Sequence, residues 1–319
     1  FLHIFLKLSI ILKIMRKNLK IAVIGSGISG LSAAWLLSKS HSVTIYEKNN
    51  YLGGHSNTQN IKTKYENKGI SVDTGFIVFN EYNYKHLCSF FKLLNVSTYE
   101  TDMSFSVSVD NGLFEYGGSN LRSLFAQKTN FLKKDFWIML IEIVRFYYKA
   151  EIDKSKYSNL TINDYLTKMK YSNFFIKNHL LPMAASIWSA PTDEIKQFPF
   201  PNFVEFFKNH GLLNLINRPK WRTVENGSRE YVKKIISKSR FKIKISEKVK
   251  SVVRENKEIK IISESNEEIF DHVIFACHSD QSLKILDKPT QHEELNLLKI
   301  RYKKNIVWLH SDEEFMPKR

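Results

Sequence analysis

Gly25, Gly27 and Gly30 form the pattern Gly-x-Gly-x-x-Gly, whose chemistry is phosphate binding. Gly25 lets the chain turn sharply at dihedral angles that a side chain would penalise. Gly27 lets a pyrophosphate approach the backbone at a helix N-terminus, and Gly30 lets that helix pack closely. About 20 residues later Glu47 offers a carboxylate that can accept hydrogen bonds from a ribose and repel a 2′-phosphate. The pattern therefore favours NAD or FAD over NADP.

The elements that must position these residues lie in the same stretch. The apolar run 20–24 predicts a buried strand, residues 31–40 a helix, and residues 41–46 a second strand that ends at Glu47. This order of strand, glycine turn, helix, strand and acid is typical of a doubly wound α/β domain. The candidate cofactor-binding turn also includes Ser26, Ile28 and Ser29.

A second glycine pair helps to distinguish the two dinucleotides. Gly53 and Gly54 follow Glu47 closely, and residues 72–76 read Val-Asp-Thr-Gly-Phe. A simple NAD domain needs no such pair, whereas the longer FAD molecule requires more backbone to approach it. We therefore favour FAD as the cofactor. The further candidate cofactor-binding residues are Lys48, Gly53, Gly54, His55, Asp73, Thr74, Gly75 and Phe76.

This layout resembles the flavin-dependent amine oxidase superfamily, which includes phytoene desaturases and protoporphyrinogen oxidases. In that superfamily the acid is followed by Gly-Gly-Arg, and a later Asp-x-Gly loop passes near the flavin. Here His55 stands at the arginine position. A neutral imidazole carries no charge at pH 7, so it would not neutralise a phosphate as arginine does.

Later stretches resemble a bacterial branch of the superfamily, whose members are described as FAD/NAD-binding or flavin-containing amine oxidase proteins. These stretches are residues 181–191, 209–213, 218–222 and 226–231, and residues 271–277 look like the strand that returns beneath the FAD. The resemblance covers residues 15–319. It implies an α/β fold, with an FAD-binding Rossmann-like (doubly wound) domain interleaved with an α+β substrate domain.

The resemblance also implies roles for single residues. His278 follows the returning strand near the flavin, where relatives often have proline, and is the candidate catalytic histidine. Lys284 lies close to where some amine oxidases hold a lysine linked through water to flavin N5; the alternative is a surface lysine. Val249 sits where relatives place the backbone that holds the adenine end.

Three residues are candidates for a substrate channel. Trp188 and Trp221 could line it, although large aromatic side chains are more often packed in a core. His210 could accept a proton or cap a helix. No Ser-His-Asp arrangement is visible in the sequence. Flavin accepts hydride itself, so a catalytic acid or base is optional.

Composition limits the partners. The 319 residues carry a net charge of +16, which compositional drift explains, with an anionic membrane surface or substrate as the alternative. No RNA-recognition motif appears, so nucleic acid is not an expected partner. Two distant cysteines fit a reducing compartment, and no Cys/His cluster has metal-ligand spacing. We expect a cytoplasmic protein, with peripheral contact at the inner membrane surface as an option; the sequence does not indicate the oligomeric state.

We expect FAD-binding segments at 15–80 and 222–285 and substrate-domain segments at 81–221 and 286–319. Helices are predicted at 86–94 and 130–149, a hairpin at 105–116, and strands at 241–245 and 259–262. Residues 131–148 are the most apolar helical stretch. They predict a core helix, or alternatively a membrane-surface helix through which an acyl or isoprenoid substrate enters.

Both ends of the chain invite interpretation. Residues 1–14 are apolar, but they are too short to span a bilayer and lack a cleavage site. We interpret them as upstream sequence before a start at Met15; a membrane-surface segment is the alternative. Residues 311–319 lack the glycine-containing segment with which the superfamily closes its FAD domain. We therefore expect the chain to be a fragment whose C-terminal part is missing.

The predicted function is that of an FAD-dependent oxidoreductase that takes hydride from a lipid-like (acyl or isoprenoid) substrate onto flavin N5. Oxidation of a small amine is the alternative within the same enzyme class. A non-catalytic flavin-binding scaffold or partner protein is the alternative from another class. RNA modification by an FAD protein has only the charge and the glycine motif in its favour.

Overall fold

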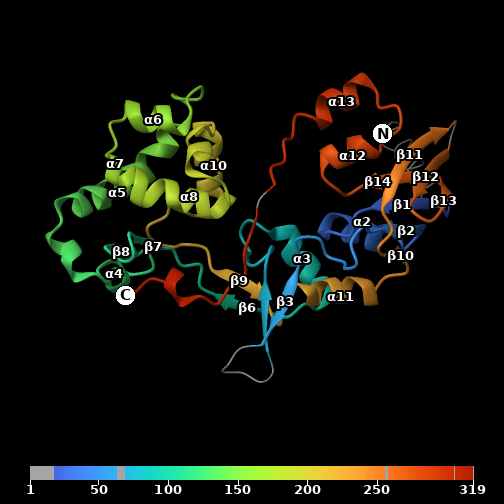
Figure 1. The fold of residues 1–319 in the computed structure, drawn as a ribbon, viewed down its shortest axis with the longest axis horizontal. Coiled ribbons are helices and arrows are strands. Elements are labelled where there is room, and N and C mark those ends of the chain that lie inside the picture. Colours follow the sequence, from blue (N-terminus) through green and yellow to red (C-terminus); the bar gives the residue numbers. More distant parts are fainter. Residues whose placement is uncertain (1–17, 63–68, 256–257, 305, 319) are drawn as a thin grey trace, which may run out of the picture. The chain divides into compact units, whose positions relative to one another are not determined.

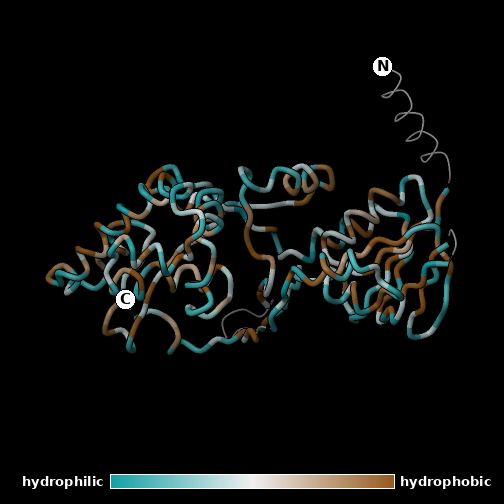
Figure 2. The backbone as a smooth tube through the Cα atoms, turned by 90° about the horizontal axis from the view of Figure 1, so that it is seen from above, coloured by the Kyte–Doolittle hydropathy of each residue, from teal (hydrophilic) through white to brown (hydrophobic). Residues whose placement is uncertain are grey.

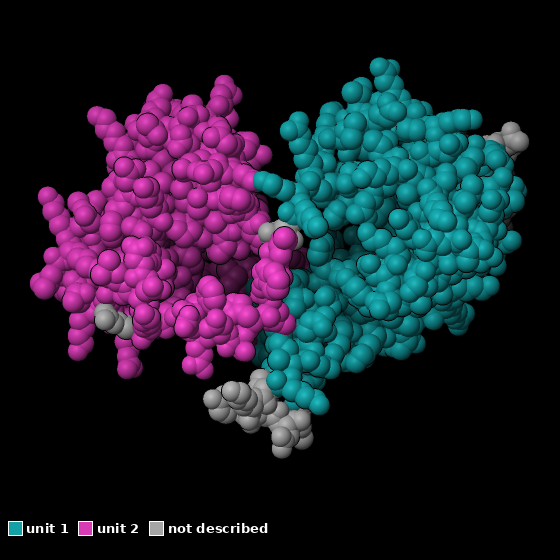
Figure 3. All heavy atoms as spheres, viewed as in Figure 1, with its two compact units in different colours: residues 1–78, 86–99, 223–304 teal, residues 79–85, 100–222, 305–319 magenta. Residues whose placement is uncertain are grey.

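The structure is a computed structural model that describes residues 18–62, 69–255, 258–304 and 306–318. The chain forms two compact units (Figures 1 and 3). Unit 1 contains the residues up to Val78, His86–Tyr99 and Thr223–Lys304. Unit 2 contains Phe79–Lys85, Glu100–Arg222 and the residues from Asn305 onward. Our interpretation of residues 1–14 lies outside the described residues.

Unit 1 is built on a four-stranded parallel sheet in the order β10-β2-β1-β14. Its strands are β1 (Lys20–Ile24), β2 (Ser42–Tyr46), β10 (Lys242–Lys244) and β14 (His272–Phe275). The two central strands are buried along almost their whole length, as expected for a parallel sheet that is covered on both faces. Figure 2 colours the backbone by hydropathy and shows hydrophobic stretches running through the chain. The parallel strands end at one edge of the sheet, where ligands bind in doubly wound folds.

Smaller sheets and helices complete unit 1. An antiparallel sheet of β11 (Val249–Glu255), β12 (Glu258–Ser263) and β13 (Glu267–Phe270) packs Val252 and Ile261 against Ala22 and Ile24 of β1. The hairpin strands are β3 (Thr58–Ile61) and β4 (Ile70–Asp73). The helices are α2 (Ile28–Leu37), α3 (Lys85–Leu94), α11 (Arg229–Ser237), α12 (Ser279–Ile285) and α13 (Gln291–Leu297). The helix predicted at 31–40 therefore begins three residues earlier, directly after Gly27.

The boundaries of the units differ from the expected ones in two places. We expected α3 in the substrate domain, but it belongs to unit 1 because Phe91 packs on Tyr231 of α11, with 5.1 Å between ring centroids. We also expected α13 in the substrate domain. It belongs to unit 1 because Arg254 of β11 forms an ion pair of 2.8 Å with Glu293.

Unit 2 is mostly helical around an aromatic core. Its helices are α4 (Leu121–Leu124), α5 (Lys134–Asp153), α6 (Ile162–Lys168), α7 (Asn173–Phe175), α8 (Leu181–Trp188), α9 (Thr192–Lys196) and α10 (Phe200–Asn209), with 3-10 helices η1 (Lys128–Leu132) and η3 (Glu313–Phe315) and a π-helix η2 (Ile176–Leu180). The predicted hairpin is present as β7 (Ser106–Val109) and β8 (Phe114–Gly117). A three-stranded sheet has the order β5-β9-β6, with β5 (Phe79–Asn80), β9 (Trp221–Val224) and β6 (Thr98–Thr101).

Helix α5 has two apolar faces. Phe136, Met139 and Phe146 are completely buried in the core of unit 2, as expected for a core helix. The predicted helix at 130–149 is shifted, because a 3-10 turn occupies Lys128–Leu132 and α5 continues to Asp153. The opposite face of α5 is exposed. Within the described part of the chain, none of the helices has the length and apolar character needed to cross a membrane.

Candidate cofactor site

The glycine turn after β1 requires glycine at two of its positions. Gly25 has a φ of +106°, and a Cβ atom there would lie 2.6 Å from the carbonyl oxygen of Ala276. A Cβ atom on Gly30 would lie 1.9 Å from the carbonyl oxygen of Gly25, because α2 crosses directly over the turn. Both contacts are with rigid backbone. Packing within unit 1 therefore explains these two glycines.

Gly27 is different, because no described atom outside its two chain neighbours lies within 4 Å of a Cβ atom built there. Its φ of −65° also suits any residue. The protein itself thus gives no reason for glycine, and the space in front of Gly27 is open. Helix α2 begins at the next residue, Ile28, and no side chain of the described residues caps it. An open space at an uncapped helix N-terminus fits a pyrophosphate group.

Glu47 is buried at the end of β2 and is held by Ser26 of the turn. Its Oε2 accepts hydrogen bonds from the Ser26 backbone N–H at 3.0 Å and from the Ser26 hydroxyl at 2.6 Å. Its Oε1 accepts a hydrogen bond from the backbone N–H of Asn49 at 2.9 Å. A carboxylate has about four acceptor positions, so room for a ribose hydroxyl remains. Beyond its predicted ribose contact, Glu47 therefore shapes the glycine turn.

The pair Gly53–Gly54 lies directly against the glycine turn. The backbone N–H of Gly53 donates to the carbonyl oxygen of Ser26 at 3.0 Å, and Gly53 forms a β-bridge with Gly27. Gly53 and Gly54 have φ values of +117° and +59°. A Cβ atom on Gly54 would come within 3.1 Å of the Gly27 Cα atom. The structure thus brings both glycine motifs together, although they are far apart in the sequence.

The loop after β4 crosses the backbone of His55. The carbonyl oxygen of His55 accepts a hydrogen bond from the N–H of Phe76 at 2.8 Å. A Cβ atom on Gly75 would lie 2.2 Å from the same oxygen, which explains the glycine of the Asp-x-Gly loop. The exposed ring of His55 lies 6.4 Å from that of His278, which in turn stacks on Tyr302 at 4.1 Å. Two predicted site residues, His55 and His278, are therefore neighbours.

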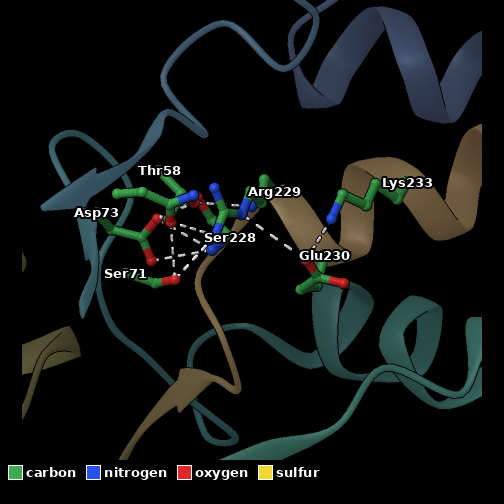
Figure 4. A network of polar contacts seen from close by, with 8 residues as sticks. Thr58, Ser71, Asp73, Ser228, Arg229, Glu230 and Lys233 are labelled. Carbon is green, nitrogen blue, oxygen red and sulfur yellow. Dashed lines mark hydrogen bonds and ion pairs between the residues drawn. The ribbon is translucent and has the colours of Figure 1, made fainter. Parts of the chain in front are cut away.

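The carboxylate of Asp73 is hydrogen-bonded to other residues of unit 1 (Figure 4). Its carboxylate accepts hydrogen bonds from the Ser228 backbone N–H at 2.9 Å, the Ser228 hydroxyl at 2.7 Å and the Thr58 hydroxyl at 2.6 Å. The next residue, Thr74, donates from its N–H and its hydroxyl to the carbonyl oxygen of Asn57, both at 3.0 Å. Asp73 and Thr74 therefore act here by positioning the loop that contains Gly75.

Sequence reasoning missed the partners of this network. Arg229 at the start of α11 donates to Asn60 at 2.5 Å and to Ser71 at 2.8 Å, so it joins both strands of the β3–β4 hairpin. A Cβ atom on Gly227 would lie 2.4 Å from a methyl carbon of Thr58. The stretch 226–231 indicated the branch of the superfamily but not this contact. The periodicity of a sequence contains no signal for such a long-range side-chain network.

Val249 lies beside the end of β2. The backbone N–H of Glu247 donates to the carbonyl oxygen of Glu47 at 2.8 Å, and that of Ser246 donates to the carbonyl oxygen of Asn49 at 3.0 Å. Val249 follows as the buried first residue of β11. The contact of its backbone with the adenine end stays a prediction.

The remaining predicted residues of unit 1 are exposed. His278 precedes α12 as its N-cap residue, directly beyond the returning strand β14. Lys284 lies exposed in the last turn of α12, where the surface-lysine alternative places it. Lys48 is exposed immediately after Glu47. The structure therefore places His278, rather than Lys284, next to another predicted site residue.

The predicted channel residues belong to unit 2. Trp188 packs in the aromatic core, with its ring centroid 4.6 Å from that of Phe206. His210 ends α10, where its Nδ1 lies 2.9 Å from the Phe206 carbonyl oxygen, and this contact favours the capping role. Trp221 begins β9 and pairs with Asn80. The role of these residues in a channel stays a prediction.

Unit 2 also contains a buried histidine that the sequence did not single out. His179 lies in the π-helix, with its Nδ1 2.8 Å from the Tyr116 hydroxyl and its Nε2 3.3 Å from the Tyr147 hydroxyl. The Tyr116 hydroxyl also lies 3.0 Å from the carbonyl oxygen of Asn178; donation to that oxygen would place the histidine proton on Nδ1 and leave Nε2 to accept from Tyr147. Burial, assisted by the positive charge of Arg218, lowers the pKa of His179 to about 3. Burial also raises the pKa of Tyr147 to about 12.

Known proteins resemble this chain in sequence and in fold. The family of flavin-containing amine oxidoreductases matches residues 28–306, and the chain belongs to this family. It is 58% identical over 40 residues to a 4,4'-diapophytoene desaturase (4,4'-diaponeurosporene-forming) of Staphylococcus aureus, a match that covers 12% of this chain and 8% of that protein.

Two solved structures illustrate the similarity of fold. A putrescine oxidase variant, made to redesign cofactor binding, has a TM-score of 0.65 at 16% identity. A CLA-producing fatty acid isomerase from P. acnes has a TM-score of 0.60 at 14% identity. Each similarity covers 88% of this chain and 64% of the solved one. The chain thus spans less than two thirds of the length of these proteins.

The cofactor of this family is FAD, and the residues of unit 1 fit it. The open space at Gly27, the uncapped start of α2 and the acid at the end of β2 provide places for a pyrophosphate and a ribose. The described residues contain no group of three or more His, Cys, Asp or Glu side chains that could hold a metal ion. The predicted fold, an FAD-binding doubly wound domain interleaved with a second α+β unit, is confirmed.

Proposed function

We propose that the chain binds FAD through unit 1 and serves an oxidoreductase that takes hydride from a lipid-like substrate. The observation that carries this proposal is the open space at Gly27, since glycine at that position has no explanation in the packing of the protein. FAD, when bound, supplies the hydride-accepting atom N5. The residues of the chain bind and orient this group.

Each predicted residue has a task in this proposal. The first N–H groups of α2, at Ile28 and Ser29, receive the pyrophosphate. Glu47 accepts a hydrogen bond from the ribose, and the backbone of Val249 holds the adenine end. The loop containing Gly75, fixed by the Asp73 network, approaches the flavin. Together these contacts would position the cofactor.

His278 is the residue that we propose to handle protons beside the flavin. It follows the returning strand, whose Ala276 carbonyl oxygen lies against Gly25 of the glycine turn. Its ring is exposed, so water can reach it. Because FAD accepts hydride directly, His278 has a supporting role and Lys284 is not required.

A lipid-like substrate is favoured over a small amine by charge. The net charge of +16 repels a cation such as a diamine and attracts an anionic lipid. Two similar proteins, the desaturase and the fatty acid isomerase, are named for reactions of long hydrocarbon chains, whereas putrescine oxidase is named for an amine. We propose a peripheral protein at the cytoplasmic face of the inner membrane that takes its substrate from lipid.

The absorption spectrum of the purified chain tests the cofactor. We expect a flavin spectrum and release of FAD on denaturation. Gly27→Val should fold normally, because the space in front of a Cβ atom at this position is open. Its side chain would fill the proposed pyrophosphate position, so the affinity for FAD should fall by about 100-fold or more. Leu36→Val, on the exposed side of the same helix, is the control and should keep FAD.

Anaerobic titration then tests the reaction. Bleaching of the flavin by an acyl or isoprenoid lipid would support the proposal. Bleaching by putrescine alone would contradict the lipid part and favour amine oxidation. A bound flavin that no member of either class reduces would favour the scaffold alternative, and a colourless parent chain would remove the basis of the whole proposal.

A further inference from the structure

The exposed face of α5 carries a continuous apolar stripe. Trp137, Ile141, Val144, Tyr148 and Ile152 retain 40%, 66%, 50%, 73% and 64% of their accessible surface. Their spacing of three or four residues places them on one side of the helix, opposite the buried face that contains Met139 and Phe146. We call these five residues the α5 stripe.

The α5 stripe is long for an apolar surface that is open to water. From Trp137 to Ile152 it extends about 22 Å at 1.5 Å per residue. Phe131 and the almost fully exposed Leu132 prolong it at the N-terminal end, and the ring of Phe131 contacts Trp137 at a centroid distance of 5.5 Å. Contiguous apolar patches of this kind mark interaction sites more often than ordinary surface.

Positive charges border this stripe. Lys134 and Lys149 are exposed on α5, and Arg122 and Lys128 are exposed in the segment before it. Of the acids on α5, Glu151 is exposed and forms an ion pair with Lys208, and Asp135 is exposed near the start of the helix. Together with the net charge of +16, this border attracts an anionic surface.

The composition of the stripe suits the boundary of a bilayer. Trp137 and Tyr148 have rings with one polar atom, the type of side chain that gathers where hydrocarbon meets water. Since α5 is too polar to cross a membrane and its other face is in the core, it can only lie along a surface. A second copy of the chain is disfavoured as the covering partner, because two stripes bordered by lysines would repel each other.

We propose that the α5 stripe docks unit 2 onto an anionic lipid bilayer. Its apolar side chains enter the boundary between headgroups and acyl chains, while the bordering lysines and arginine contact lipid phosphates. This inference gives a surface to the membrane contact in the proposed function. Docking requires neither flavin nor substrate, so a failure here and a failure of the flavin proposal are distinguishable.

Vesicle sedimentation of the full chain tests the inference. We expect binding to vesicles of phosphatidylglycerol and phosphatidylcholine, weak binding to pure phosphatidylcholine, and loss of binding at high salt. The variant Ile141→Ser/Val144→Ser/Ile152→Ser should bind at least about tenfold more weakly, because three apolar side chains leave the interface. The matched control Leu36→Ser/Ile269→Ser/Leu298→Ser changes three similarly exposed residues of unit 1 and should bind like the parent.

Three outcomes would overturn the inference. The parent chain could fail to sediment with anionic vesicles, or the stripe variant could bind as tightly as the parent. Analytical ultracentrifugation gives the third: a parent dimer that the stripe variant converts to a monomer would assign the stripe to a second copy. Because all three stripe substitutions are at exposed positions, circular dichroism and thermal unfolding should be unchanged, and a loss of binding cannot be attributed to unfolding.

Discussion

The glycine turn of unit 1 and the buried histidine of unit 2 differ in what surrounds their polar groups. At Gly27 the space in front of the Cα atom is open, and no side chain of the described residues caps the start of α2. Around His179 each polar atom has a partner within unit 2, and the ring is enclosed by Tyr116 and Phe175. A polar position that the protein leaves open therefore indicates a ligand, whereas polar groups that are all hydrogen-bonded within the protein indicate a structural role.

The largest effect should come from Gly30, where the turn allows no side chain. Gly30→Ala places a methyl group 1.9 Å from the Gly25 carbonyl oxygen, so we expect unfolding of unit 1 to become easier by about 4 kcal/mol or more. Gly27→Ala is the matched control, with an expected cost below about 1 kcal/mol. Chemical denaturation monitors both, and similar losses for the two variants would contradict the geometry of the turn.

Asp73 should have the next largest effect. Asp73→Ala leaves the Ser228 N–H and the hydroxyls of Ser228 and Thr58 without their acceptor, which should cost about 3 kcal/mol. Asp102→Ala, at an exposed position, is the control and should cost less than about 0.5 kcal/mol. Hydrogen exchange should show faster opening at the start of α11 in Asp73→Ala. Unchanged exchange there would show that the network does not fix the loop.

The pH dependence of the stability of unit 2 tests the role of the buried His179. The pKa of His179 is about 3 in the folded state against an ordinary 6.5. The contribution of this residue to the stability of unit 2 is therefore fully present above pH 6.5 and declines as the pH falls toward 3. The slope approaches about 1.4 kcal/mol per pH unit, and we expect the free energy of unfolding to fall by about 2 kcal/mol between pH 6.5 and 4.5.

His179→Gln removes this titration and should flatten the profile. His292→Gln, at an exposed position of α13, should leave the profile as in the parent. Denaturation curves followed at several pH values make the comparison. An equal slope in His179→Gln and the parent would mean that other groups cause the acid sensitivity of unit 2.

The smallest effect concerns the histidine tautomer. Tyr147→Phe removes the donor to Nε2, a contact of 3.3 Å, and should destabilise unit 2 by about 1 kcal/mol. Tyr148→Phe is the neighbouring control, since that ring is exposed in the α5 stripe. The ¹⁵N chemical shifts of His179 report the tautomer directly; a proton on Nε2 would refute the assignment.

The glycine turn after β1 could be predicted from the sequence, but the side-chain networks around Asp73 and His179 could not. The tight turn at Gly25 and Gly30 and the acid after β2 could be predicted, because such a turn requires particular residue types at fixed local spacing. The binding of a cofactor by these residues stays a prediction. The two units were also foreseeable, from the alternation of strand-rich and helical stretches. Their boundaries at α3 and α13 were not, because long-range contacts decide which unit a helix joins.

Side-chain partners far apart in the chain left no local pattern. The Asp73 carboxylate was predicted to serve the cofactor, but it is held by Ser228, which lies 155 positions later. His179 occupies an apolar stretch without any recognisable motif, and only the fold brings Tyr116 and Tyr147 to its two nitrogens. Spacing predicts what the backbone needs, whereas these contacts depend on how the finished units pack.

The pairing of β1 with β14 has a consequence for synthesis on the ribosome. Ile21 pairs with His272, so the central strand of unit 1 lacks one neighbour until about 250 further residues have been made. At about 5–20 residues per second this delay lasts roughly 10–50 s, during which one edge of an apolar strand has no partner. An unpaired apolar strand edge is prone to aggregate, so we expect the yield in cells to rise when chaperones that shield such edges are co-expressed.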